Sequence, residues 1–207
     1  MDARPTPGMT NMADAVSIEQ IKTELRRDAG ARRDVLPAEE RKAAAEAIAA
    51  RAFPLPIMAG AIVSGFMPFK SEINPLPLLQ KLEGAGAQLA LPRIVGRGHP
   101  LSMRAWEFGA PLERGQWGLR EPRADASEVD PDILIVPLLV FDRAGYRLGF
   151  GAGYYDMTLA ALRARKTIVA VGIAFAAQEM PAVPRTERDA RLDLVLTERE
   201  VIDLRGR

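Results

Sequence analysis

The stretch formed by residues 133–156, ILIVPLLVFDRAGYRLGFGAGYYD, limits the possible folds more than any other part of the chain. Its first part, residues 133–141, is apolar except for Pro137, which is typical of a strand buried on both faces of an α/β sheet. Residues 142–145 predict a turn. The spacing of apolar residues after position 153 then predicts a helix over residues 154–165. The stretch therefore indicates a strand, a loop and a helix in succession.

Glycines occupy the alternate positions 149, 151 and 153, between the predicted turn and the predicted helix. Such a run makes either a tight turn or a site where backbone amides and a helix N-terminus face an anion, with phosphate as the natural ligand. It is neither a dinucleotide fingerprint, which needs glycine in place of Tyr154, nor a P-loop, which needs Gly-Lys-Ser/Thr. Arg147 and Asp156 at its two ends favour function. Arginine can bind a phosphate oxygen, and a carboxylate can share a divalent cation with a phosphate.

Residues 145–156, GYRLGFGAGYYD, closely resemble the signature of the 5-formyltetrahydrofolate cyclo-ligase family, whose members are also called 5,10-methenyltetrahydrofolate synthetases. The resemblance extends over roughly residues 18–196. It implies a ligase of folate and one-carbon metabolism that converts 5-formyltetrahydrofolate to 5,10-methenyltetrahydrofolate. In that reaction ATP and Mg²⁺ are used, the formyl oxygen is phosphorylated, and ADP and phosphate are released.

The remainder of the chain predicts a matching fold class, α/β, as a three-layer single domain with a mainly parallel central sheet flanked by helices. A strand, a helix and a strand follow one another over residues 61–92, which indicates parallel pairing. Ser17 and Gln20 form a predicted capping box, with Val16 against Ile21 as a hydrophobic staple. We expect helices at residues 17–28, 37–51 and 75–83, the last capped by Asn74, and strands at 61–66, 88–92, 101–108, 167–174 and, finally, 192–196. Residues 109–130 and 181–191 are expected to be loops.

Lys22 and Arg26 lie four residues apart, on one face of the first predicted helix. Viewed alone, that spacing is typical of a solvated basic face. The cyclo-ligase family has a lysine and an arginine at this spacing near its N-terminus, where they bind ATP phosphates. The resemblance therefore implies phosphate binding by both residues, with Arg26 also near the folate.

The resemblance implies a site assembled from several parts of the chain. Glu72 and Trp117, taken alone, would be a surface carboxylate and a packed loop anchor, whereas a pterin could donate hydrogen bonds to the first and stack on the second. Arg147 is the implied catalytic residue, and Asp156 and Asp189 are the implied Mg²⁺ ligands. ATP would be bound by Lys22, Arg26, Arg147, Leu148, Gly149, Phe150, Gly151, Ala152, Gly153, Tyr154 and Tyr155. The folate substrate would be bound by Arg26, Met67, Glu72, Trp117, Phe150, Gly151, Ala152, Gly153 and Tyr154.

Three positions depart from the common pattern of the family. Arg188 stands where a histidine commonly precedes the metal-binding aspartate, and its charge could pair with Asp189 or face the phosphates. Met157 replaces a basic residue, which could lower nucleotide affinity. Arg120 departs from the usual residue beside the Glu-Pro pair.

Composition restricts the alternatives further. The chain has 207 residues, 28 basic and 27 acidic, so one domain over residues 17–207 is the simplest organisation and general nucleic-acid binding is disfavoured. Residues 1–16 lack an apolar centre and are expected to be a disordered leader. No segment is apolar enough to cross a bilayer. The absence of cysteine excludes thiol chemistry and suits a cytoplasmic location, and we expect a monomer that binds only small molecules.

Two rival functions stay open at this point. The chain could be a nucleotide- or folate-binding relative without turnover, for which Arg188 and Met157 are the only indications. It could also be a sugar-phosphate isomerase or acyl-carrier enzyme on a similar scaffold, because a fold alone does not determine a function.

Overall fold

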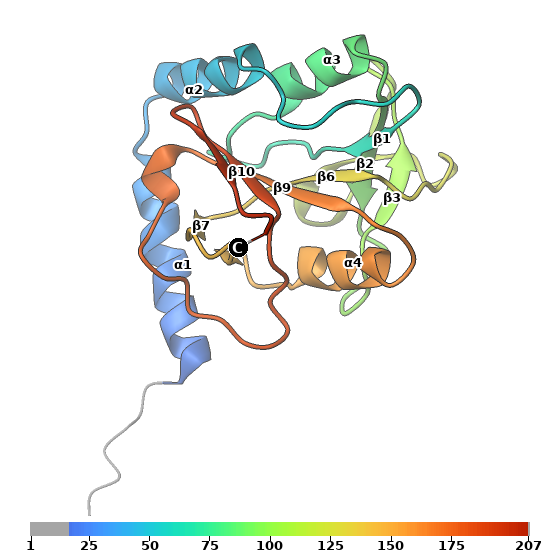
Figure 1. The fold of residues 1–207 in the computed structure, drawn as a ribbon. Helices are drawn as coiled ribbons and strands as arrows, with labels where there is room; N and C mark the ends of the chain where they lie inside the picture. Colours follow the sequence, from blue (N-terminus) through green and yellow to red (C-terminus); the bar gives the residue numbers. More distant parts are fainter. Residues whose placement is uncertain (1–16, 207) are drawn as a thin grey trace, which may run out of the picture.

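A computed structural model describes residues 17–206 of the chain. A seven-stranded sheet forms the middle layer, in the order β11-β10-β9-β6-β1-β2-β3 (Figure 1). Its strands are β1 (Ile62–Ser64), β2 (Gln88–Arg93), β3 (Ser102–Ala105), β6 (Ile133–Val136), β9 (Val169–Ile173), β10 (Leu194–Leu196) and β11 (Val201–Asp203). The five central strands pair in parallel, and β3 and β11 close the two edges in antiparallel orientation. The predicted fold class is confirmed. The expected leader, residues 1–16, and the staple residue Val16 lie outside the described residues.

Four helices surround the sheet: α1 (Ile18–Asp34), α2 (Ala38–Ala50), α3 (Leu76–Gly84) and α4 (Tyr154–Arg163). Figure 1 shows α2 and α3 over one face of the sheet and α4 on the other. The sequence of β6 explains this sandwich, because successive side chains of a strand point to opposite faces. Ile133 and Ile135 pack with α2 and α3, and Leu134 and Val136 pack with α4.

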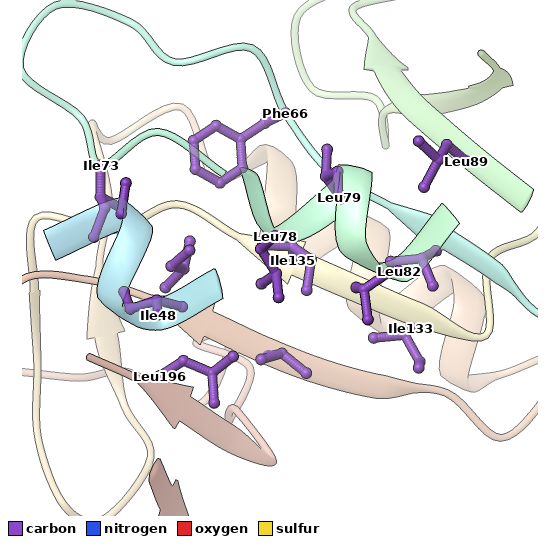
Figure 2. Packing of buried hydrophobic residues seen from close by; sticks show 14 of the residues in the cluster. Ile48, Phe66, Ile73, Leu78, Leu79, Leu82, Leu89, Ile133, Ile135 and Leu196 are labelled. Atoms are coloured by element: carbon purple, nitrogen blue, oxygen red, sulfur yellow. The ribbon is translucent and has the colours of Figure 1, made fainter. Parts of the chain in front are cut away.

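The core between the sheet and the first helical layer is built from branched aliphatic side chains. Ile48 of α2 and Leu78, Leu79 and Leu82 of α3 lie over the strands (Figure 2). Gly65, just after β1, lies under Leu79, whose Cδ1 would be 2.2 Å from a Cβ at that position. Any larger residue there would force the side chain of Leu79 to move within a closely packed core.

The strand predicted over residues 133–141 is interrupted at Pro137, so the expectation of one continuous strand is wrong. Proline has no N–H to donate and is excluded from a central ladder. The chain continues as β7 (Val140–Phe141), which pairs with β8 (Arg147–Leu148) in a separate hairpin. Gln178 donates to the carbonyls of Leu138 and Leu139 at 2.8 and 3.0 Å, which supplies hydrogen bonds that the sheet no longer provides.

The first helix is longer than expected. The capping box of Ser17 and Gln20 is present, but the helix continues to Asp34 rather than ending near residue 28. Ala29 is buried in a small cluster with Leu139 and Leu148, so tertiary packing holds the additional turns.

Other boundaries also differ from the sequence predictions. Leu194–Leu196 is not the final strand, because β11 follows and pairs with it. The expected loop at residues 109–130 contains a hairpin of β4 (Leu112–Arg114) and β5 (Arg120–Pro122) around a short 3₁₀ turn, Gln116–Gly118. The strand expected over residues 101–108 is only β3. Pro75, rather than Asn74, occupies the cap of α3, and the Asn74 side chain accepts from the N–H of Leu76.

The order of strands creates a reversal beside β1. The chain passes from β1 to β2 in one direction across the sheet and then returns to β6 on the other side of β1. Ligands of open α/β sheets bind at the carboxyl ends of strands next to such a reversal. Residues 65–74, which follow β1, and Pro137, which follows β6, lie at this edge.

Candidate active site

A cleft of about 960 Å³ opens at this edge of the sheet. Every residue predicted from the sequence to bind ATP, folate or metal lines it. These residues come from α1, the loop after β1, the β4–β5 hairpin, the glycine loop at residues 149–153, the first turn of α4, and the loop before β10. The structure therefore brings together segments that are up to 167 residues apart in sequence.

Lys22 of α1 and Asp189 form an ion pair in the wall of the cleft. The ammonium of Lys22 donates to Asp189 Oδ2 at 2.6 Å, and the Thr186 N–H donates to the same oxygen at 2.5 Å. Burial alone would raise the pKa of Asp189, but the hydrogen bonds from Lys22 and Thr186 bring that pKa below its usual value. The loop before β10 is thus held against α1 by a charged pair.

Arg147 and Asp156 form a second charged pair beneath the glycine loop. The buried guanidinium of Arg147 donates to Asp156 Oδ1 at 2.9 Å and to the carbonyl of Ala190 at 2.5 Å. The Ala190 N–H also donates to Asp156 Oδ1, at 3.0 Å. Burial lowers the pKa of Arg147, and the charge of Asp156 opposes that effect. The two ends of the glycine motif are therefore linked directly.

The carboxylates of Asp156 and Asp189 suit a hard cation that takes most of its ligands from water and substrate and only one or two from the protein. In residues 17–206 no group of three or more histidine, cysteine, aspartate or glutamate side chains could hold a metal ion. Mg²⁺ commonly uses only one or two protein carboxylates together with water and substrate phosphates. Oδ2 of Asp156 and Oδ1 of Asp189 accept no hydrogen bond from the described part of the chain. The two carboxylates thus fit a Mg²⁺ ion that would take its remaining ligands from water and substrate.

The glycine loop requires glycine at two positions for different reasons. Gly153, immediately before α4, has φ +70°. Gly151 has φ +103°, and a Cβ there would lie 3.2 Å from the guanidinium carbon of Arg26. The Nε of Arg26 donates to the Gly149 carbonyl at 3.1 Å. Left-handed backbone therefore lets Arg26 pack directly onto the loop, next to the positive N-terminus of α4.

Glu72 lies in the loop after β1 and lines the cleft. Its Oε2 accepts from the Phe69 N–H at 2.8 Å, and its Oε1 accepts no hydrogen bond from residues 17–206. Burial raises the pKa of Glu72, with the Phe69 hydrogen bond and the charge of Arg33 acting in the opposite direction. A partly buried carboxylate with one such oxygen is suited to accept hydrogen bonds from a bound ligand.

Trp117 stands at the tip of the β4–β5 hairpin and lines the cleft. It has φ +54°, which is uncommon for a bulky residue, and is 59% exposed. Its ring lies 6.1 Å from that of Tyr154, with an angle of 51° between the planes. Trp117 is therefore not a packed loop anchor, and it presents an aromatic surface at the cleft.

Known proteins resemble this chain over most of its length. Residues 18–198 match the model of the 5-formyltetrahydrofolate cyclo-ligase family. The chain belongs to that family.

Two relatives named 5-formyltetrahydrofolate cyclo-ligase illustrate the similarity. The protein from Mycolicibacterium smegmatis is 33% identical over 193 residues, covering 89% of this chain and 97% of the relative. The one from Escherichia coli K12 is 31% identical over 179 residues, covering 82% and 96%. The solved structure of Aquifex aeolicus 5,10-methenyltetrahydrofolate synthetase has a TM-score of 0.74 and 32% identity, covering 90% of this chain and 95% of that one. The predicted enzyme class, a cyclo-ligase of folate metabolism, is confirmed, and the isomerase-like alternative has no support.

The three positions expected from the sequence to depart from the family pattern also line the cleft: Arg120, Met157 and Arg188. Arg188 makes no ion pair with Asp189, which is paired with Lys22 instead. The guanidinium of Arg188 is therefore available to face a ligand.

Sequence reasoning missed several cleft residues of this cyclo-ligase. Phe69 packs edge-on against Phe150, with ring centroids 6.4 Å apart. Glu121 of β5 is buried, accepts from the Ile94 N–H at 3.3 Å, and lies so close to Gly115 that a Cβ there would be 2.2 Å from its carboxyl carbon. The Glu121-Pro122 pair was a usable signal for Glu121. The sequence contains no such signal for Phe69, because its contact with Phe150 depends on how two loops that are distant in sequence pack together.

Proposed function

We propose that this protein uses ATP and Mg²⁺ to convert 5-formyltetrahydrofolate to 5,10-methenyltetrahydrofolate, with release of ADP and phosphate. Family membership supports the overall conversion. The observation that carries the finer proposal is the convergence, in one cleft, of cations, carboxylates, a glycine loop, Glu72 and aromatic side chains. This arrangement suits a triphosphate and a flat, hydrogen-bonding ring system.

The formyl oxygen is a poor leaving group, so the reaction must begin by activating it. The formyl oxygen on N5 attacks the γ-phosphorus of ATP, the bond to ADP breaks, and an iminium phosphate remains. The lone pair of N10 then attacks the former formyl carbon. Loss of the N10 proton and departure of phosphate leave the N5–C–N10 bridge of the product. Positioning and charge stabilisation account for such a reaction without a side-chain nucleophile, as expected for a chain that has no cysteine.

The phosphate end of the cleft would be formed by Lys22, Arg26 and Arg147 and by the amides of residues 149–153. Without a ligand, Lys22 and Arg147 are paired with Asp189 and Asp156. Phosphate oxygens would take over the two cations and release the two carboxylates. The site thus keeps its charges compensated before and after the nucleotide binds, which limits the cost of burying them.

Asp156 and Asp189 would hold Mg²⁺. When bound, Mg²⁺ would neutralise charge on the phosphates during transfer. The role of this chain's own residues is to present two carboxylates beside the glycine loop, each with one oxygen that accepts no hydrogen bond within residues 17–206.

The folate would lie between Trp117, the Phe150–Tyr154 part of the glycine loop and Met67. Glu72 would accept hydrogen bonds from the amino-pyrimidine edge. The indole of Trp117 is exposed and tilted against the ring of Tyr154. A pterin ring that stacked on the indole would bury its apolar face, which supports stacking at this position.

The decisive experiment is to incubate the purified protein with 5-formyltetrahydrofolate, ATP and Mg²⁺ and to follow the absorbance of the methenyl product. We expect product to form with equal amounts of ADP and phosphate, and to stop when ATP is omitted or the metal is chelated. Folded protein that binds ATP but gives no product would support an inactive binding relative instead. Product formation without ATP would refute the phosphoryl-transfer mechanism.

A further inference from the structure

Arg33, in the last turn of α1, is a buried cation just behind the cleft wall. It is 3% exposed, and its Nε donates to Ser71 Oγ at 3.0 Å. The Ser71 hydroxyl in turn donates to Asp34. The Nη1 of Arg33 is fully buried and has no hydrogen-bond partner among residues 17–206. An unused donor on a buried cation is costly, so packing alone is a poor explanation for arginine at this position.

The guanidinium of Arg33 contacts Phe150, which lines the cleft, and Ser71, which precedes a residue that lines it. The guanidinium carbon is 5.5 Å from the ring centroid of Phe150, within the range of a cation–π interaction. Phe150 belongs to the glycine loop and also contacts Phe69. Ser71, which Arg33 orients, immediately precedes Glu72. Arg33 therefore contacts both the loop proposed to bind phosphate and the loop proposed to bind the pterin.

The groups that interact electrostatically with Glu72 or Arg33 come from three helices. Burial disfavours the ionised carboxylate of Glu72, whereas Arg33 of α1 favours it. Burial lowers the pKa of Arg33, the charges of Glu72 and Asp34 oppose that effect, and the charge of Arg41 of α2 adds to it. On α4, burial raises the pKa of Tyr155 and the charge of Glu72 adds to that effect, so Tyr155 stays neutral. Arg33 is thus the cation that counteracts the effect of burial on Glu72.

We propose that Arg33 is a positioning residue: it holds Phe150 of the glycine loop and, through Ser71, places a positive charge at the segment that carries Glu72, for folate binding. This inference rests on the proposed function, because it concerns the folate end of that site. It assigns a role to a residue that does not itself line the cleft.

The test compares Arg33→Met with the wild-type protein by calorimetric titration of 5-formyltetrahydrofolate, from mildly acidic to neutral pH. Methionine keeps much of the length of the side chain and removes its charge. Without that charge, Glu72 takes up a proton at a higher pH, so the loss of binding on acidification should begin at a higher pH than in the wild type. Arg33→Lys, which keeps the charge, should retain the wild-type pH profile with weaker binding at every pH.

Arg32→Met is the matched control, because Arg32 is an exposed neighbour on the same helix and loses the same charge. It should bind like the wild type. If Arg33→Met does not fold, Arg33→Gln removes the charge while keeping a donor for Ser71, with the same expected change. A purely structural role would alter thermal stability but leave the pH profile of binding unchanged, and that outcome would overturn the inference. Methenyl formation by the wild type is measured in parallel, so failure of the proposed function is recognised separately.

Discussion

At the scale of single residues, the cleft is an arrangement of compensated charges. Lys22 with Asp189 and Arg147 with Asp156 are pairs in which a mostly buried cation meets a partly exposed carboxylate. The net contribution of such pairs to folding is small, because desolvation offsets much of the attraction. Their value is that each carboxylate is held beside the glycine loop in a defined position.

Asp156→Asn tests the metal-binding role directly. Asparagine keeps an acceptor oxygen for the Arg147 and Ala190 N–H groups and removes the negative charge, so the fold should persist. We expect turnover to fall by about 100-fold or more, because loss of a ligand should exceed the effect of losing a supporting residue. The measurement is the rate of methenyl formation against Mg²⁺ concentration, with circular dichroism as the check on folding.

Asp125→Asn is the matched control, since Asp125 is an exposed aspartate that is also paired with an arginine. It should retain wild-type turnover. Wild-type rate and Mg²⁺ dependence in Asp156→Asn would rule out the assigned role of Asp156.

At the scale of elements, the backbone of the glycine loop sets the start of α4. Gly153 precedes that helix in the left-handed region, and no other atom lies within 4 Å of the position that a Cβ would take there. The demand for glycine at this residue is therefore conformational and not steric. At Gly151 glycine is required for both reasons, because the backbone is left-handed and a Cβ would also lie close to the guanidinium of Arg26.

Gly153→Ala should lower the free energy of unfolding by about 1–2 kcal/mol, the usual cost of placing an L-residue in left-handed backbone. Gly149→Ala is the comparison, because Gly149 is not in that region and a Cβ there would also meet nothing within 4 Å. It should be neutral or stabilising by a few tenths to about 1 kcal/mol. Urea denaturation of both variants measures the difference, and equal stability would show that the loop relaxes at no cost.

Prediction from sequence succeeded where the chemistry is local and failed where it depends on tertiary contacts. Residues 147–156 form a contiguous motif, and the family resemblance pointed to Lys22 and Arg26, whose helical spacing alone predicts a solvated basic face; all of these predicted site residues line the cleft. The end of α1 could not, because packing of Ala29 against Leu148 holds its last turns. Arg33 was missed for the same reason, since its partner Ser71 is 38 residues away.

At the scale of the whole molecule, function and stability make opposing demands on two carboxylates of the cleft, the partly buried Glu72 and the buried Glu121. Glu72 and Glu121 both have pKa values raised chiefly by burial. A raised pKa means that the folded state binds the proton more tightly than the unfolded state. The resulting stabilisation is fully present below the unfolded pKa and is lost as the pH rises through the folded pKa. At neutral pH the ionised carboxylates therefore reduce stability.

Glu72→Gln should consequently be more stable than the wild type at neutral pH while binding 5-formyltetrahydrofolate less tightly. The difference in stability should disappear below about pH 4.5, the ordinary pKa of the glutamate side chain. Urea denaturation across the acidic to neutral range measures it, with Glu24→Gln, an exposed substitution on α1, as the control. A constant difference at all pH values would contradict the assigned cause.

The length of α1 has a consequence for how the two ends of the cleft influence each other. Lys22 contacts Asp189 near one end of this helix, and Arg33 contacts Ser71 near the other. An α-helix rises 1.5 Å per residue, so the two contacts are about 16 Å apart along its axis. In the proposed site, a displacement of this helix by a nucleotide would move Arg33 and, through Ser71, the segment that carries Glu72. The affinities for the two proposed substrates would then depend on each other, and thermodynamic linkage requires that dependence to be mutual.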